Sequence, residues 1–262
     1  MFNTYVKLDK DVIQHIEKTT QEIILSYLEA ISQKRKLNGL KTYFLLCPYC
    51  KNSLIVFVNG LPKFCTKCGE TNPFQKLENS INKASILYRL VHESDEQVTR
   101  VLLEQCMVIL ATCIEVFLRD IYSTTLNLRY IKRGQSIIER FYNEVKNDFI
   151  NTGKIRKRFK EMGVDIKNTF GKEVVKDINL LLLKRNVIVH NNGIIDKAFL
   201  SSSGLNVNIG SKIEISKDEI ENCISLVNDL SNGLEEFYKS EFFHAIYEEL
   251  VNYFNDINSQ EG

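Results

Sequence analysis

The sequence predicts a mainly α-helical protein, a helical bundle that carries a β-rich insert and one small β-hairpin. Three observations predict this fold class. Apolar residues recur at helical spacing over most of the 262 residues, all three prolines lie between positions 48 and 73, and short β-branched runs occur there and again near residue 210. A chain of this length with 44% hydrophobic residues can bury a substantial core.

The first segment, residues 1–40, is predicted to form an amphipathic helix that packs on the bundle. Its apolar residues occur at helical spacing, which places them on one face. They are Val12, Ile13, Ile16, Ile23, Ile24, Leu28 and Ile31.

Residues 41–76 form the β-rich insert, with strands expected at 43–46 and 54–58 and a hairpin turn at Asn59-Gly60. Two CxxC pairs separated by fourteen residues lie within it: Cys47, Cys50, Cys65 and Cys68. Each CxxC turn directs two thiolates to one point, so two such turns complete the tetrahedral four-sulfur shell that structural zinc prefers. We therefore predict a four-cysteine zinc ribbon. A redox pair is disfavoured because no thioredoxin-like βαβ pattern surrounds either motif.

The role of this ribbon stays open at the level of sequence. About thirty residues cannot bury an adequate core, so metal binding is expected to supply its folding energy. A closed shell of four thiolates has no open coordination position, so the zinc is expected to be structural. The aromatic and basic residues of the ribbon could contact single-stranded nucleic acid, but the ribbon could equally be a structural element or dock a protein.

Residues 77–262 are expected to form the helical domain. Ser94 and Gln97 form a capping-box pattern ahead of an apolar helix over 98–121. The remaining helices follow from the same periodicity and are expected near 136–160, 172–190, 217–238 and 241–257. Between them, the alternating apolar residues of 205–215 predict the small β-hairpin.

No apolar run approaches the roughly 20 residues that a bilayer-spanning helix needs, and the N-terminus lacks the apolar segment of a signal peptide. A cytoplasmic location without a membrane partner is therefore expected. In that compartment cysteines are thiols or metal ligands rather than disulfides. Cys106, Cys113 and Cys223 fall on apolar helical faces and are expected to be buried small hydrophobes.

The net charge of +1 hides an uneven distribution, with a basic run before residue 185 and an acidic C-terminal part. The densest part of the basic run is Lys154, Arg156, Lys157, Arg158 and Lys160. A basic patch favours a polyanionic partner, most commonly nucleic acid, so these residues are candidate RNA contacts. The alternative is an ordinary solvated helix face.

The most informative stretch runs from Arg185 to His190. Arg185 continues an apolar helical stripe, where a guanidinium is costly to bury without an anionic partner. His190 lies at the expected end of the helix, where the helix dipole favours its cationic form. A fixed cation beside a titratable imidazole predicts a phosphate-handling site. In the structural alternative, Arg185 pairs with Glu115 or Glu104 and His190 caps the helix.

Arg185, Asn186 and His190, at the end of a helix in an all-helical domain, resemble the motif of the HEPN superfamily, the higher eukaryotes and prokaryotes nucleotide-binding domains. The resemblance covers roughly residues 80–240 and leaves the zinc ribbon outside it. Many members are metal-independent endoribonucleases of bacterial toxin, abortive-infection and antiviral defence systems. The resemblance implies an HEPN-like bundle in which these three residues are catalytic.

Metal-free RNA cleavage needs a base for the 2′-hydroxyl, an acid for the leaving 5′-oxygen and a cation for the phosphorane charge. One His190 cannot readily be both acid and base, but two copies can, so a homodimer is expected. Its products would carry 2′,3′-cyclic phosphate ends. The alternatives are a non-catalytic RNA- or nucleotide-binding adaptor, which includes a toxin–antitoxin partner, and a zinc-ribbon regulator that binds DNA or a polymerase. An antitoxin or regulatory protein is a further expected partner.

Overall fold

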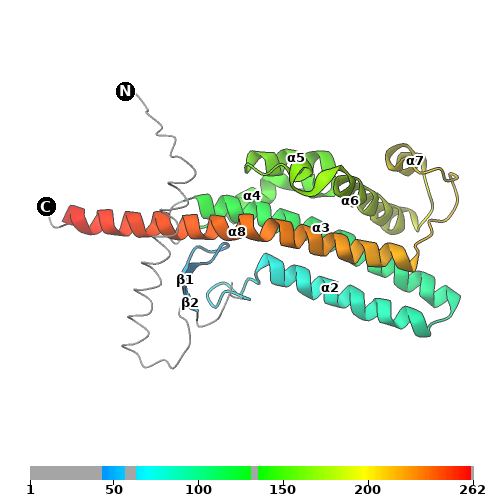
Figure 1. Ribbon diagram of the computed structural model, residues 1–262, viewed down its shortest axis with the longest axis horizontal. Coiled ribbons are helices and arrows are strands. Elements are labelled where there is room, and N and C mark those ends of the chain that lie inside the picture. The colour runs from blue at the N-terminus through cyan, green and yellow to red at the C-terminus, as the bar shows by residue number, and fades with distance from the viewer. Residues whose placement is uncertain (1–42, 57–62, 131–134, 261–262) are drawn as a thin grey trace.

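The computed structural model describes residues 43–56, 63–130 and 135–260 (Figure 1). The predicted N-terminal helix within 1–40 and the predicted Asn59-Gly60 turn lie outside these described residues. Within them, the protein is mainly helical, as the periodicity predicted.

Four long helices form the body of the molecule: α2 (Pro73–Leu90), α3 (Glu96–Arg129), α6 (Ile166–Asn191) and α8 (Lys217–Gln260). Figure 1 shows α3 and α8 side by side along the long axis, with α2 and α6 on opposite sides of this pair. Three shorter helices complete the bundle: α4 (Ile138–Val145), α5 (Thr152–Glu161) and α7 (Lys197–Ser203). Two single 3₁₀ turns precede α3 and α5, namely η1 (Val91–Glu93) and η2 (Asp148–Ile150).

Helix α3 is the centre of the core. Its buried side chains recur every three or four positions and include Leu103, Cys106, Leu110, Ile114, Phe117 and Ile121. Phe74 of α2 packs edge-on against Phe117, with 5.2 Å between ring centroids, and lies 5.4 Å from the Tyr238 ring of α8. Three helices therefore meet over one aromatic cluster at the ribbon end of the bundle.

Helix α3 is also long and apolar enough to span a bilayer by length and composition, with a mean hydropathy of 2.1 over its most apolar window. This finding corrects the expectation that no such run exists in the sequence. Half of that window is buried inside the protein, where α2, α6 and α8 pack against it. A central helix must be apolar on several sides because it has neighbours on several sides.

Helix boundaries differ from the predictions at three places. The region 136–160 is not one helix, because Lys146 adopts a positive φ of 35° and ends α4. Residues 217–260 form one continuous helix, α8, without the break that was predicted between 238 and 241. The N-cap of α3 is Asp95 instead of Ser94, and its carboxylate accepts a hydrogen bond from the first turn.

The predicted β-hairpin over 205–215 is not seen. Its second half instead lies beside the segment that follows α6, where the Ile213 N–H donates to the Gly193 carbonyl at 2.7 Å. Ile213 is buried, whereas Leu205 and Ile209 are exposed. Residues 211–213 therefore pair with residues 193–195, which precede α7, and not with the first half of the predicted hairpin.

Helix α6 bends at Gly171, whose φ of 89° and ψ of 167° lie in a region that only glycine adopts readily. The bend places the Phe170 ring against α8 at Gly233. A Cβ atom at Gly233 would lie only 2.1 Å from the Phe170 ring, so this close approach requires glycine. The helix predicted over 172–190 is the straight part of α6 beyond the bend.

The ribbon contains strands β1 (Tyr43–Leu46) and β2 (Ser53–Val56). They pair antiparallel, with Tyr43 opposite Val56 and Leu46 opposite Ser53. The first CxxC turn connects the two strands. This turn therefore both joins the two strands and carries two of the four cysteines.

Candidate functional site

The four cysteines of the ribbon converge on one point. Their Sγ atoms all lie within 4.8 Å of one another, with 3.7 Å between Cys47 and Cys68 and 3.8 Å between Cys50 and Cys65. A tetrahedral zinc shell with Zn–S bonds of about 2.3 Å requires sulfur separations of about 3.8 Å. The four residues therefore fit the metal site that their spacing predicted.

Two equivalent backbone turns build this cluster. The Lys51 N–H donates to the Cys47 carbonyl, and the Gly69 N–H donates to the Cys65 carbonyl, both at 2.8 Å. Lys51 and Gly69 both have a positive φ, 56° and 76°. The Lys67 N–H points at the Cys65 Sγ, 3.3 Å away. Lys51 therefore adopts, at a conformational cost, the backbone geometry that glycine provides in the second turn.

Burial disfavours the charged form of two of the cysteine thiols, those of Cys47 and Cys68. Cys47 is buried, and burial raises the pKa of its thiol far above the ordinary value. A divalent cation offsets this cost because it binds the thiolate directly. Zinc at this site would cross-link the two turns, and the four thiolates would leave it no open position.

Asn127 of α3 seats the ribbon on the helical bundle. It is fully buried, and its amide nitrogen donates to the carbonyls of Pro48 and Tyr49, at 2.8 and 2.9 Å, within the first CxxC turn. Its side-chain oxygen accepts from the Ile137 N–H at the start of α4, at 3.0 Å. One side chain therefore joins the metal-binding turn to two helices.

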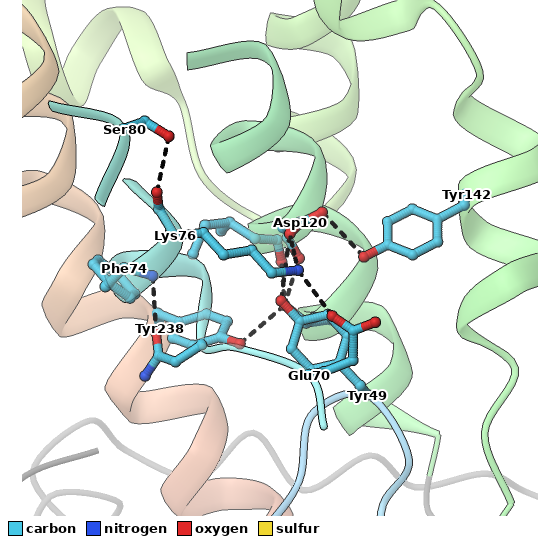
Figure 2. Close-up of polar contacts among 11 residues, drawn as sticks. Tyr49, Glu70, Phe74, Lys76, Ser80, Asp120, Tyr142 and Tyr238 are labelled. Atoms are coloured by element: carbon cyan, nitrogen blue, oxygen red, sulfur yellow. Dashed lines mark hydrogen bonds and ion pairs between the residues drawn. The ribbon is translucent and has the colours of Figure 1, made fainter. Parts of the chain in front are cut away.

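A buried carboxylate makes the second connection (Figure 2). Asp120 of α3 accepts hydrogen bonds from the Lys76 ammonium at 3.0 Å, the Tyr142 hydroxyl at 3.0 Å and the Tyr49 hydroxyl at 3.3 Å. Lys76 also lies over the Tyr49 ring, 4.7 Å from its centroid. These four residues, the Asp120 cluster, come from α3, α2, α4 and the ribbon, so the cluster joins four elements.

The carboxylate shifts the pKa values of its neighbours. Burial is the largest single influence on the pKa of Lys76 and acts to lower it, but the charges and hydrogen bonds of Asp120 and Glu70 together outweigh burial, so the net shift is upward. Burial and the same charge raise the pKa of Tyr49 and of Tyr142. Each partner is thereby held in the protonated form that donates to Asp120.

Asp120 was not among the predicted site residues. A signal was present, since this aspartate lies three residues after Phe117 and one before Ile121, on the face of α3 that the apolar pattern buries. A carboxylate at such a position requires a cationic or hydrogen-bonding partner. The partners could not be identified because they lie in three other elements.

The residues predicted to be catalytic lie at the C-terminal end of α6. Arg185 Nη1 donates to Asn186 Oδ1 at 3.0 Å. Arg185 Nη2 lies 3.9 Å from the Glu115 carboxylate of α3, a loose ion pair that matches part of the structural alternative. The Arg185 Nε is buried and has no hydrogen-bond partner among the described residues. The guanidinium therefore has donor capacity that its described neighbours do not use.

Of the two acids considered as partners of Arg185, Glu104 lies near a different cation. Its carboxylate is 3.9 Å from Lys212 Nζ. His190 is exposed in the last turn of α6. It does not cap the helix, because that position belongs to Asn192, with a φ of 52° and an N–H that donates to the Val187 carbonyl.

The five candidate RNA contacts all lie on α5 but divide into two groups. Lys154 and Arg158 are committed to the Asp148 carboxylate, at 3.0 and 2.9 Å. The other three are exposed and form no ion pair within the part of the chain that the structure describes: Arg156, Lys157 and Lys160.

Helix α5 does not lie beside His190. It packs along the N-terminal half of α6, where the Thr152 hydroxyl donates to Asn179 Oδ1 at 3.1 Å. His190 lies eleven residues beyond Asn179, about 16 Å along the helix axis at 1.5 Å per residue. The basic run is thus close to the Arg185 motif along the chain but separated from it in space.

Cys106, Cys113 and Cys223 are buried, as predicted. Burial raises the pKa values of their thiols to about 11, 12 and 12, respectively. Thiols that ionise this weakly are poor nucleophiles at neutral pH, which supports their assignment to the core.

Compared with known proteins, the chain matches no family model, no curated protein and no solved structure. The features of this chain that bear on function are the four-cysteine cluster, the Arg185 motif and the α5 cations.

Proposed function

We propose that this protein is a metal-independent endoribonuclease of the HEPN type that acts as a homodimer, in the role of a toxin or anti-phage defence effector. One observation carries the proposal. Arg185 contacts Asn186, keeps a buried Nε without a partner among the described residues, and lies at the same end of α6 as the exposed His190. A cation that its protein neighbours do not fully satisfy favours an anionic ligand, and a phosphodiester is one.

Each motif residue has a role in this chemistry. His190 would take the proton from the 2′-hydroxyl, and the second His190 of a dimer would give a proton to the leaving 5′-oxygen. Arg185 would stabilise the negative charge that develops on the phosphorane oxygens. Asn186 would orient the Arg185 fork through their 3.0 Å hydrogen bond. The products would be a 2′,3′-cyclic phosphate and a 5′-hydroxyl.

The surface near Arg185 supports the homodimer. Helix α3 carries a stripe of apolar and β-branched residues that are all exposed or half-buried, and the last three of them line a hollow beside α2: Val98, Val101, Val108, Thr112 and Val116. Val189 and Ile194, near His190, are exposed as well. A second copy packed on this side would cover apolar surface and bring the two Arg185 motifs together.

The zinc centre is proposed to be structural. The ribbon uses Tyr49 to reach the Asp120 cluster and accepts hydrogen bonds from Asn127, so one side of it faces the helices. The four thiolates would hold zinc, and the zinc would cross-link the two CxxC turns. These contacts favour a clamp on α3 over the alternative of a free ribbon that reads DNA.

The test is RNA cleavage by the zinc-loaded protein in buffer with EDTA, with its zinc content checked afterwards. The substrates are total tRNA and messenger RNA. We expect His190→Ala and Arg185→Ala each to lower the cleavage rate by about 100-fold or more. His92→Ala is the matched control, since His92 is an exposed histidine of η1 that lies against the Tyr88 ring, and it should leave cleavage unchanged.

The adaptor alternative has one observation in its favour, the ion pair between Arg185 and Glu115 at 3.9 Å. It predicts RNA or nucleotide binding without cleavage by any variant. Light scattering adds an independent result, because the proposal requires a particle of twice the 30.3 kDa chain mass. A monomer with no nuclease activity would overturn the proposal.

A further inference from the structure

The three uncommitted cations of α5 are well placed for a ligand because nothing in the described part of the chain neutralises them. Arg156 and Lys160 are four residues apart and therefore adjacent on one helix face, with Lys157 beside them. The opposite face of α5 is anchored by the buried Ile155 and Phe159. Lys154 and Arg158 flank the group but are held by Asp148. The α5 face is defined here as Arg156, Lys157 and Lys160.

The α5 face and His190 belong to one side of α6. Thr152 contacts Asn179, so α5 packs on the side of α6 that Asn179 occupies. His190 follows Asn179 by eleven residues, which is about three helical turns. The two side chains therefore leave the helix axis in directions that differ by only about 20°. Asn186, seven residues from Asn179, lies on the same stripe. A ligand that leaves the Arg185 motif along this stripe therefore runs toward α5, past the C-terminal end of α7, where the Ser202 carbonyl accepts a hydrogen bond from Asn179 at 3.5 Å.

The separation sets a length for that ligand. Helix α5 runs antiparallel to α6 from Asn179 back toward the start of α6, so the α5 face lies roughly 20 to 30 Å from His190 along the axis. A stacked nucleic-acid strand advances about 3.4 Å per nucleotide, so roughly six to nine nucleotides cover this distance.

We infer that the α5 face is a second RNA-contact surface that holds the substrate strand roughly six to nine nucleotides from the bond cleaved at His190. This inference rests on the proposed function and adds a substrate class, namely RNA that extends well beyond the cleaved dinucleotide. The cations act on the phosphates and not on the bases, so the surface discriminates by length and not by sequence.

The experiment measures RNA binding by fluorescence anisotropy with zinc-loaded His190→Ala protein, so that cleavage plays no part. Two RNAs are compared, one of about 24 nucleotides and one of about 5, which is too short to reach α5. We expect the combined change Arg156→Glu, Lys157→Glu and Lys160→Glu to weaken binding of the long RNA at least tenfold and to leave the short RNA unaffected. The salt dependence of long-RNA binding should also fall by about two units of slope.

The matched control makes the same change of charge elsewhere, at the exposed Lys83, Arg89 and Arg100 of α2 and α3. It should weaken long-RNA binding far less. Circular dichroism checks folding, and the neutral triple change to Gln replaces the Glu variant if that variant does not fold. Equal losses in the control, equal losses on both RNAs, no loss at all, or equally tight binding of duplex DNA would each overturn the inference.

Failure of this inference can be told apart from failure of the proposed function. If the protein with His190 intact cleaves no RNA but the binding results follow the expected pattern, the α5 face stands and the nuclease proposal fails. If RNA is cleaved and the α5 changes alter neither binding nor cleavage of long RNA, the nuclease proposal stands and the α5 face is wrong.

Discussion

At the scale of single residues, the role of a buried or half-buried charge depends on how fully its partners satisfy it, and the two ends of the bundle differ in this respect. Asp120 has three donors within hydrogen-bond distance and is fully committed to the fold. Arg185 has one good acceptor in Asn186 and one distant acid in Glu115. The first arrangement stabilises the protein, and the second leaves capacity for a ligand.

Removing the competing acid beside Arg185 should improve RNA binding. With Glu115→Gln, the guanidinium loses a loose ion pair of the kind worth about 0.2 to 1 kcal/mol, so RNA affinity should rise up to about fivefold. Arg185→Lys keeps the charge but loses the planar fork, and cleavage should fall about 100-fold. Comparison of kcat/KM and urea unfolding for both variants checks this. Equal losses of stability in both, with cleavage falling in proportion, would show that the pair is structural.

Neutralising the buried carboxylate should weaken the fold. Asp120→Asn leaves Lys76 without its main partner, at a cost of about 1 to 3 kcal/mol. This is less than the roughly 3 to 5 kcal/mol typical of fully buried pairs, because the Lys76 side chain is 30% exposed and also contacts Glu70. Urea unfolding of the zinc-loaded protein measures the change. The control is Glu173→Gln, which removes an exposed pair with Lys176 and should cost less than about 0.5 kcal/mol. Equal costs in the two variants would contradict the role of the Asp120 cluster.

At the scale of elements, the ribbon and the helices are held together by a small number of specific contacts. Among the described residues of the ribbon, the buried apolar side chains are those of a small cluster around Cys47, Tyr49 and Cys65, and the ribbon is joined to the helices by Asn127 and the Asp120 cluster. The contact between α6 and α8 depends on two glycines, Gly171 at the bend of α6 and Gly233 of α8 beside the Phe170 ring. In both cases one short motif determines how two elements approach each other.

Loss of the metal should raise hydrogen-exchange rates outside the ribbon as well as within it. Chelation, or Cys50→Ser, releases the first CxxC turn and with it the Tyr49 contact to Asp120. Hydrogen exchange should therefore speed up in the second half of α3 and in α4, and should change little at the C-terminal end of α6. Cys223→Ser is the control, since Cys223 is buried far from the cluster in sequence and should leave zinc content at one per chain. Faster exchange confined to the ribbon would contradict a clamp.

Adding one methyl group to α8 should disturb the bend of α6. Gly233→Ala places a Cβ 2.1 Å from the Phe170 ring and should destabilise the protein by about 1 to 3 kcal/mol through overpacking. Thermal or urea unfolding measures the loss. In the double variant Gly233→Ala/Phe170→Ala, the alanine at 233 should cost less than it does alone. Additive costs would show that the ring and the glycine do not oppose each other.

At the scale of the whole molecule, α3 is the element on which the other parts depend. It packs against α2, α6 and α8, carries Asp120 and Asn127 for the ribbon, and places Glu115 beside Arg185. The ribbon and the Arg185 motif, which lies on α6, therefore both contact α3, through different residues of that helix. Metal binding is therefore expected to support the site through stability and not through chemistry.

Alkaline pH should destabilise the whole fold. Folding raises the pKa values of Tyr49, Tyr142 and Tyr238, so each keeps its proton in the folded state above pH 10, where the unfolded chain loses it. Stability is therefore fully present below about pH 10 and falls as pH rises further, by up to about 1.4 kcal/mol per pH unit for each tyrosine. Urea unfolding at pH 8 and 10.5 checks this. Tyr142→Phe should show a shallower decline, and an identical decline would contradict the assignment.

The sequence by itself determined what depends on neighbours within a few turns. The spacing of Cys47, Cys50, Cys65 and Cys68 was enough to predict a common ligand cluster, and helical periodicity was enough to predict the fold class. The position of Arg185 and His190 at the end of a helix followed in the same way. The cysteines of one CxxC turn, and the residues of one helix face, could be predicted to lie close together because backbone geometry alone fixes the distance between such residues.

Only the tertiary structure decided which distant groups meet. Asp120 binds Lys76 and Tyr142 across separations of 44 and 22 residues, and the 205–215 segment finds its backbone partner before α7. The α5 cations, close to His190 along the chain, lie away from it because α5 folds back along α6. Contacts between elements depend on how whole helices pack, and packing is a property of the assembled core that spacing along the chain does not encode.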